Sequence, residues 1–207
     1  LSGCLIIGWL FGQITIWLKR WKLAEVLLVV SVVMAGSWLA WEQRDMAVPE
    51  TYSMVTRPDL RAMSWIDEHT EPEAVFLVEG FRAFYNTSAV GADAGWWLPL
   101  LAGRENSMPP LYALSSEIPV EDGYSQRVVA LMAALETTLL NTPEGIDLLC
   151  EYGISHVYIG QQQGTVGLGW LQQAYAADEL VNQPAYELIY HQDRVYIFAV
   201  EPGACDD

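Results

Sequence analysis

The first 41 residues constrain the fold more than any other part of this chain. Residues 1–18 are almost wholly apolar, and residues 23–41 are apolar apart from Glu25. At about 1.5 Å of rise per helical residue, each stretch is just long enough to cross a hydrocarbon core of about 30 Å. The sequence therefore predicts two transmembrane α-helices, at 1–18 and 23–41, ahead of a larger domain.

The basic residues between the two apolar stretches predict how the helices are oriented. Lys19, Arg20 and Lys22 lie in the short loop 19–22. Short loops rich in lysine and arginine stay on the cytoplasmic side of a membrane. Tryptophans flank this loop and the far end of the second stretch, as in the aromatic belts of membrane proteins. We therefore expect a cytoplasmic loop and an extracytoplasmic domain.

The start of the chain predicts that it is part of a longer protein. It begins at Leu1, and no polar segment precedes the first apolar stretch. A secretory signal peptide has a basic start and a single apolar stretch, and neither feature fits here. We interpret the chain as the C-terminal piece of a multi-pass cell-membrane protein, with residues 42–57 as an external connector and 58–207 as the extracytoplasmic domain.

The predicted external part is strongly acidic. From Glu42 onward it has seven arginines and 25 of the 26 acidic residues, which gives a formal charge of −18. Such a surface repels polyanions, so we predict that nucleic acid is not a partner. A stretch of about 165 residues is ample for one hydrophobic core.

The three cysteines predict little about structure. Cys4 lies in the first predicted span, so only Cys150 and Cys205 share the outer compartment. A disulfide can form there, but a buried free Cys150 on a helix is the interpretation that we favour. No cysteine or histidine spacing matches a zinc site, and we predict no metal site in this chain.

Hydrophobic periodicity predicts a small α/β (or α+β) domain with a mixed sheet. Helices are expected at 58–69, 124–140, 142–153 and 170–181, and strands at 74–78, 154–159, 186–190 and 195–200. The last two strands are expected to form a hairpin across 191–194. Residues 80–90 and 105–110 are expected to be loops. Residues 160–169 carry four glycines without the spacing of a phosphate-binding loop, so a surface loop is expected.

Residues 91–104 are the best candidate for a binding site. Asp93 precedes the paired Trp96 and Trp97, and Arg104 follows them. Paired tryptophans present flat apolar faces that stack on sugar rings or pack on a neighbour. An acid beside them can accept hydrogen bonds from hydroxyl groups. These four residues are our candidate substrate-binding residues; alternatively, the tryptophans dock the domain on the membrane surface or on its own core.

Three segments carry a resemblance to a known family: residues 65–77, the Trp96–Trp97 pair with the later Gly-Arg, and residues 147–159. Together they resemble the C-terminal extracytoplasmic region of bacterial multi-spanning glycosyltransferases of the GT-C type. These are similar in outline to the oligosaccharyltransferase catalytic subunit and to polyprenyl-phosphate sugar transferases. In the oligosaccharyltransferases, a Trp-Trp-Asp-Tyr-Gly motif helps to hold the acceptor. Here both tryptophans match, Leu-Pro-Leu follows them, and the acid precedes the pair.

The resemblance implies a function for the parent protein. The parent would transfer a sugar from a lipid-phosphate donor to an acceptor, with this domain capping the external active site. In the family, the catalytic acids lie in early external loops, and a divalent cation (Mg²⁺ or Mn²⁺) acts with them. We therefore expect no catalytic residue in this piece and no activity of the piece alone.

The expected partners follow from the same resemblance. They are membrane lipid, the lipid-linked sugar donor, an unknown acceptor and upstream transmembrane helices of the same protein. The alternative is a non-catalytic, membrane-anchored domain for assembly or carbohydrate binding at the cell envelope. A third class, the tail of a transporter or sensor, also fits the two predicted spans.

Overall fold

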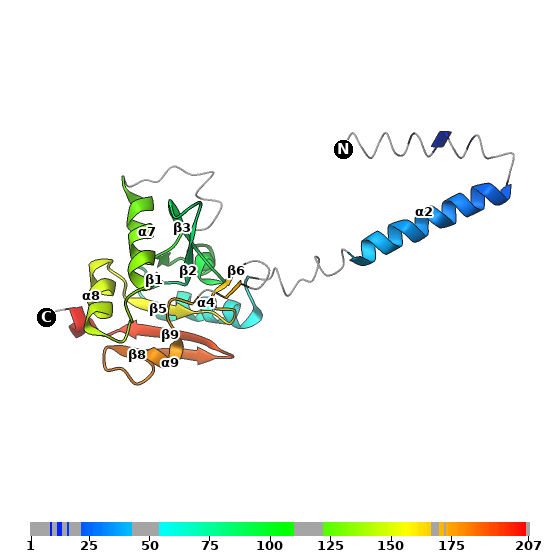
Figure 1. The fold of residues 1–207 in the computed structure, drawn as a ribbon. Helices are drawn as coiled ribbons and strands as arrows, with labels where there is room; N and C mark the ends of the chain where they lie inside the picture. Colours follow the sequence, from blue (N-terminus) through cyan, green and yellow to red (C-terminus); the bar gives the residue numbers. More distant parts are fainter. Residues whose placement is uncertain are drawn as a thin grey trace. The chain divides into compact units, whose positions relative to one another are not determined.

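The computed structural model describes residues 9, 12–13, 16, 22–42, 54–109, 122–166, 170–171 and 173–205 (Figure 1). The chain divides into two units, Leu1–Glu50 and Thr51–Asp207. Most of the predicted first span and of the basic loop lies outside the described residues. In the first unit, helix α2 (Lys22–Glu42) covers the second apolar stretch, and ten large apolar side chains between positions 26 and 41 are exposed. Among the residues that the structure describes, no helix is long and apolar enough to cross a membrane.

The second unit is an α/β domain built on a mixed five-stranded sheet. Its helical segments are α4 (Arg57–His69), η2 (Gly95–Trp97), α5 (Leu98–Leu101), α7 (Tyr124–Leu135), α8 (Pro143–Glu151), α9 (Ala177–Leu180) and η3 (Pro202–Cys205). Its strands are β1 (Val75–Leu77), β2 (Gly80–Ala83), β3 (Ser88–Gly91), β4 (Glu105–Asn106), β5 (His156–Ile159), β6 (Thr165–Val166), β7 (Trp170–Leu171), β8 (Tyr186–Gln192) and β9 (Val195–Val200).

The main sheet has the strand order β4-β1-β5-β9-β8. Strand β1 runs parallel to β4 and β5, whereas β9 runs antiparallel to β5 and β8. Strands β2 and β3 form a separate antiparallel hairpin, and β6 pairs with β7. The predicted fold class, a small mixed sheet with helices, is confirmed for this domain.

Local sequence signals set the ends of the predicted helices and of the hairpin. Thr56 caps α4 in a reciprocal capping box with Asp59, and a proline occupies the first turn. Thr142 caps α8 through its side chain alone, which accepts a hydrogen bond from the Gly145 N–H. In the β8–β9 hairpin, Asp193 and Arg194 adopt φ values of 50° and 67°, as a two-residue turn between antiparallel strands requires.

Several predicted elements are corrected by the structure. Residues 80–90 are not a loop, because β2 and β3 pair there from Gly80 opposite Gly91 to Ala83 opposite Ser88. Residues 105–106 form β4 within the segment expected to be a loop. The helix predicted at 124–140 ends at Leu135. The helix predicted at 170–181 is reduced to α9, since the backbone N–H of Ala174 is bound by the Glu79 carboxylate.

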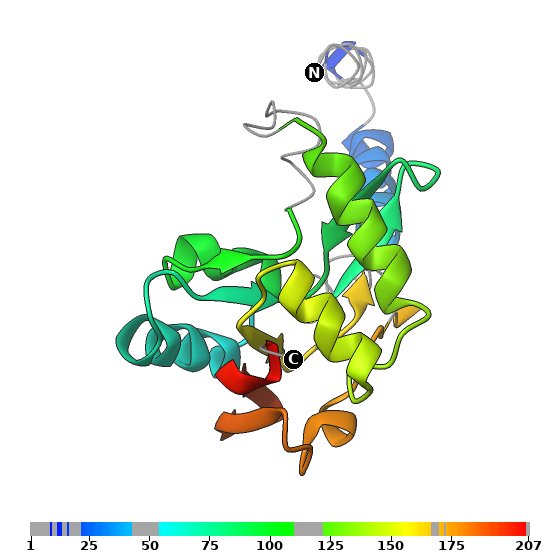
Figure 2. The same cartoon turned by 90° about the vertical axis from the view of Figure 1, so that its left-hand side faces the viewer.

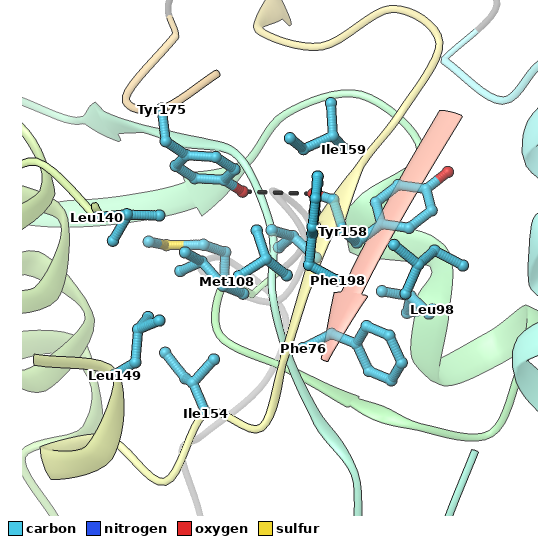
Figure 3. Packing of buried hydrophobic residues seen from close by; sticks show 14 of the residues in the cluster. Phe76, Leu98, Met108, Leu140, Leu149, Ile154, Tyr158, Ile159, Tyr175 and Phe198 are labelled. Atoms are coloured by element: carbon cyan, nitrogen blue, oxygen red, sulfur yellow. Dashed lines mark hydrogen bonds between the residues drawn. The ribbon is translucent and has the colours of Figure 1, made fainter. Parts of the chain in front are cut away.

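The core fills both faces of the central strands. Val157, Tyr158 and Ile159 of β5 are all buried, although neighbouring residues of a strand point to opposite faces. Figure 3 shows Phe76, Met108 and Phe198 packed beside Tyr158, with the Tyr175 hydroxyl directed at the Tyr158 carbonyl. This double coverage gives the domain a dry interior, in which the polar groups described below are held.

The expectation of a free Cys150 is wrong. Cys150 in α8 forms a disulfide with Cys205 in η3, and their Cα atoms lie 5.6 Å apart. The two residues are 55 positions apart in the sequence. Strand β9 lies within the sheet, and the segment that follows it reaches α8. Local sequence patterns do not encode this approach of two distant segments.

Candidate functional site

The predicted site at 91–104 begins with a tight turn at Asp93. This residue has a φ of 50°, and its Oδ1 accepts a 2.8 Å hydrogen bond from the backbone N–H of Gly95. Aspartate tolerates this left-handed backbone and commonly bonds the N–H two residues on. The turn leads directly into η2, which carries Trp96 and Trp97.

The two tryptophans pack against each other. Their ring centroids lie 5.9 Å apart with an interplanar angle of 85°, an edge-to-face geometry that is favourable for aromatic pairs. Both residues are partly exposed. Among the described residues, neither indole Nε1–H of Trp96 and Trp97 has a hydrogen-bond acceptor, and both nitrogens are buried. Buried donors without a partner are rare in folded proteins, so these two N–H groups are an unusual feature of the segment.

Asp93 itself is not on the surface. Only 2% of it is exposed, and its Oδ2 has no hydrogen-bond partner among the described residues. A Cβ atom added to Gly160 would lie 3.3 Å from both Cγ and Oδ2 of Asp93, so the carboxyl group packs against the backbone that follows β5. The structure therefore places this side chain inside the domain, where it shapes the turn that carries the tryptophans.

Asp93 belongs to a cluster of three buried acids that come from different segments. The other two are Asp59 in α4 and Glu79 after β1, and they are 0% and 1% exposed. Oδ1 of Asp59 accepts hydrogen bonds from the Tyr158 hydroxyl at 2.8 Å and the Gln161 N–H at 3.0 Å. Tyr158 in the sheet and Gln161 in the segment after β5 thus both hold the cluster through Asp59.

Glu79 connects the cluster to the segment that includes the predicted glycine loop. One carboxylate oxygen accepts the Ala174 N–H at 2.9 Å, and the other accepts Nε2 of Gln163 at 3.0 Å. Nε2 of Gln163 also donates to the Tyr175 carbonyl. The expected surface loop at 160–169 is therefore fastened to the core at Gln163; its residues 167–169 lie outside the described residues.

Burial raises the pKa values of Glu79 and Asp93. Desolvation raises the pKa of Glu79 to about 7, against hydrogen bonds from Ala174, Gln163 and Gly80 that lower it. Desolvation also raises the pKa of Asp93 well above its usual value, and the neighbouring charges of Glu79 and Asp59 raise it further. The N–H groups of Gly95 and Gly164 act in the opposite direction. The cluster therefore retains at least one proton at pH values where exposed carboxyl groups are ionised.

Arg104 anchors the far end of the candidate segment. Its Nη2 donates to the backbone carbonyls of Asp67 and Thr70 at 3.0 and 2.8 Å, and its Nη1 donates to the carbonyl of Ala102 at 3.0 Å. These bonds satisfy carbonyl groups at the C-terminal end of α4, where a cation is also favoured by the helix dipole. Because only 8% of Arg104 is exposed, its donors serve the fold.

The structure thus divides the four predicted site residues by position. It brings Trp96 and Trp97 together at the partly exposed surface, and it buries Asp93 and Arg104 as the two anchors of their segment. Sequence reasoning missed Asp59 and Glu79. The capping-box spacing from Thr56 marks Asp59, and an acid directly after a continuous apolar strand marks Glu79.

The residues that the structure describes do not suit a metal ion. Within them, no group of three histidine, cysteine, aspartate or glutamate side chains lies close enough to hold one. A divalent cation implied by the family resemblance therefore has no ligand set in the described part of this chain.

Comparisons with known proteins give only weak structural likenesses. No protein-family model matches the chain, and no curated protein matches it significantly. Among solved structures, the chain is similar to the C-terminal globular domain of an oligosaccharyltransferase from Archaeoglobus fulgidus, with 13% sequence identity and a TM-score of 0.44. The match covers 71% of this chain and 99% of that domain. Both similarity values are too low to assign a function to this chain.

Proposed function

We propose that this chain is the C-terminal part of a GT-C-type membrane glycosyltransferase that uses a lipid-phosphate sugar donor. In this proposal the domain caps the external active site, and Trp96 and Trp97 contact the acceptor. The observation that carries it is the tryptophan pair, which is partly exposed and has two indole N–H groups without acceptors among the described residues. The sequence resemblance of residues 58–159 supplies the reaction class.

The anchoring of the pair supports a binding role. Asp93 fixes the turn before it through the Gly95 N–H, and Asn106 donates a 3.0 Å hydrogen bond to the Gly95 carbonyl. A Cβ atom added to Gly91 would lie 2.8 Å from Cβ of Trp96, so the backbone is packed closely against the first ring. Rings held in this way lose little conformational entropy when a ligand binds. The exposed parts of the two rings would pack against the acceptor.

Two features support the membrane and external location that this function requires. The first is the pair of apolar stretches, since the apolar side chains of α2 are exposed and would be covered by lipid. The second is the disulfide between Cys150 and Cys205, which suits an oxidising compartment outside the cytoplasm. In the proposal the transfer chemistry belongs to upstream external loops, and this chain binds and orients the acceptor.

A second function is favoured by the same tryptophan pair. Aromatic faces bind carbohydrate without any catalytic group, so a non-catalytic, membrane-anchored carbohydrate-binding domain fits the geometry of the pair as well. The two functions differ in one respect: the first requires sugar transfer by the native protein, and the second requires sugar binding alone.

The experiment tests transfer in the native, full-length protein. We expect Trp96→Ala and Trp97→Ala to lower sugar transfer from a polyprenyl-phosphate donor about tenfold or more. A loss of about 1.4 kcal/mol in binding free energy corresponds to a tenfold loss of affinity. The Phe variants at both positions separate the loss of the N–H donor from the loss of the apolar face. Leu100→Ala, at a position that is 73% exposed on α5, is the matched control and should transfer normally.

Two outcomes contradict the proposal. Unchanged transfer in both Ala variants, with the thermal unfolding midpoint also unchanged, rules out the acceptor role of the pair. A native protein that binds oligosaccharide through the pair and transfers no sugar supports the carbohydrate-binding function instead.

A further inference from the structure

The tip of the β2–β3 hairpin exposes two aromatic side chains. Phe84 is 58% exposed and Tyr85 is 102% exposed, which is as open as in an extended peptide. Figure 2 shows this tip projecting outward past α7, away from the sheet. A single exposed aromatic residue is ordinary, but two adjacent ones at the end of a projecting hairpin form an apolar point of contact.

The backbone of the tip is strained. Phe84, Tyr85 and Asn86 adopt φ values of 48°, 57° and 64° in succession. Left-handed backbone costs roughly 1–2 kcal/mol for a residue with a side chain, and bulky residues adopt it rarely. Thr87 holds this conformation, because its N–H and its hydroxyl both donate to the Phe84 carbonyl, at 3.2 and 2.7 Å. Strain that the structure maintains in this way is most often found at functional positions.

The hairpin below the tip is fixed. Its four-residue ladder is regular, and Ala89 and Val90 of β3 are buried. Arg82 forms a two-pronged ion pair with Glu136, in which its Nε donates to Oε1 at 2.9 Å and its Nη2 donates to Oε2. The regular part of the hairpin therefore ends directly below the exposed aromatic side chains.

The charge of the tip differs from that of the domain around it. Residues 83–88 carry no charged side chain, and the nearest arginine in the sequence is paired with Glu136. The chain from Glu42 onward has a formal charge of −18. Such a domain is repelled by anionic surfaces, so contact at this tip must come from aromatic burial and not from charge attraction.

We propose that Phe84 and Tyr85 insert into the interfacial region of the lipid bilayer that carries the chain. The proposal rests on the proposed function, which puts α2 in a membrane. Phenylalanine suits the edge of the acyl region, and tyrosine keeps its hydroxyl among the headgroups. Only residues 43–53 separate α2 from the described start of the domain, and that length of chain spans at most about 45 Å. In the proposed function, this connector limits how far the domain can move from the lipid.

The test measures the surroundings of position 85 in the full chain. The protein carries Cys4→Ser and Tyr85→Cys, is reconstituted in phosphatidylcholine nanodiscs, and bears a nitroxide spin label at position 85. Collision of the label with oxygen, which concentrates in lipid, is compared with collision with a water-soluble nickel complex. Glu187→Cys, at an exposed position on β8, is the matched control. Because position 85 is fully exposed, labelling there should leave the fold intact.

We expect the ratio of oxygen to nickel collisions to be several-fold higher at position 85 than at position 187. High salt should not change it, since the proposed contact is uncharged. A label at position 85 that is as open to nickel as the control overturns the proposal. A label that neither reagent reaches also overturns it, because it indicates a protein partner.

An independent measurement separates the two proposals. Resistance of the full chain to alkaline extraction from liposomes reports whether the N-terminal helices are embedded, whatever the tip does. An embedded chain with a water-exposed position 85 contradicts only the inference about the tip. A chain that is extracted contradicts the membrane location in the proposed function, and the inference about the tip fails with it.

Discussion

The hydroxyl group of Tyr158 in β5 donates a 2.8 Å hydrogen bond to Oδ1 of Asp59 in α4, across 99 positions of sequence. Asp59 is completely buried, and its other oxygen is bound by the N–H of Thr56 at 2.8 Å. One carboxyl group therefore caps a helix and joins that helix to the sheet. This junction lies at the base of the acidic cluster that contains Asp93.

Removing the Tyr158 hydroxyl should weaken this junction. We expect Tyr158→Phe to lower the free energy of unfolding by about 1–2 kcal/mol, since a buried carboxyl group loses one of its hydrogen-bond donors. Urea denaturation measures the change. Tyr175→Phe is the control, because its hydroxyl makes only a 3.4 Å bond to a backbone carbonyl. If both variants lose the same free energy of unfolding, the hydrogen bond to Asp59 contributes no more than the weaker bond of Tyr175.

The raised pKa of Glu79 predicts how stability depends on pH. The folded chain keeps the Glu79 proton up to about pH 7, whereas the unfolded chain releases it near the ordinary value of 4.5. Between these values the folded state binds more protons, so stability falls as the pH rises and levels off above about 7. The full effect of this shift is roughly 3 kcal/mol.

Glu79→Gln should remove this pH dependence. We expect the stability of the variant to change less between pH 4.5 and pH 8 than that of the native chain, because the amide carries no charge at either pH. Its stability is offset by a constant amount, since the amide NH2 group cannot accept one of the two hydrogen bonds that Glu79 accepts. Denaturation across this range measures the difference. Glu187→Gln, on the exposed face of β8, should leave the native profile unchanged. If the stability of the native and Glu79→Gln proteins depended on pH in the same way, the raised pKa of Glu79 would be contradicted.

Asp93 should tolerate an amide but not alanine. Asparagine has the same shape, accepts the Gly95 N–H and adopts left-handed backbone readily, so Asp93→Asn should match or exceed native stability at neutral pH. Asp93→Ala loses the acceptor at a φ of 50° and should cost about 1–3 kcal/mol. Thermal unfolding and tryptophan fluorescence report stability and the packing of the Trp pair. Equal stability of both variants would contradict the role of Asp93 in the turn.

Arg104 should not be replaceable by lysine. Its planar guanidinium reaches the backbone carbonyls of Asp67 in α4 and of Thr70 and Ala102, the residues that follow α4 and α5, and one ammonium group cannot satisfy all three together. We expect Arg104→Lys to lower the free energy of unfolding by about 1–3 kcal/mol. Arg127→Lys, at an exposed position, should change it by no more than about 0.5 kcal/mol. Full stability of Arg104→Lys would show that charge alone is sufficient at this position.

The disulfide should contribute strongly to stability. A crosslink between residues 55 positions apart lowers the entropy of the unfolded chain by the equivalent of about 4 kcal/mol in the chain-entropy treatment. We therefore expect a reducing agent to lower the urea midpoint of the native chain and to leave that of a Cys150→Ala, Cys205→Ala double variant unchanged. A urea midpoint of the native chain that the reducing agent does not change would contradict the disulfide between Cys150 and Cys205.

The sequence by itself determined the elements whose signals are local. The ends of α4 and α8 follow from Thr56, Thr142 and the prolines after them, and the β8–β9 turn follows from Asp193. In each case the side chain bonds or shapes backbone within a few residues of itself, so the information needed is contained in one short segment. The candidate pair Trp96 and Trp97 could be proposed from the sequence because the two residues are adjacent in it.

Only the tertiary structure decided the features that join distant segments. The β2–β3 hairpin escaped prediction because bulky residues form its turn in a backbone usually given to glycine or asparagine. The parallel pairing of β1 with β4 and β5, the Cys150–Cys205 bond and the meeting of Asp59 with Glu79 and Asp93 depend on which segments pack together. The roles of Asp93 and Arg104 as buried anchors depend on burial, which is a property of the packed domain and not of any local pattern.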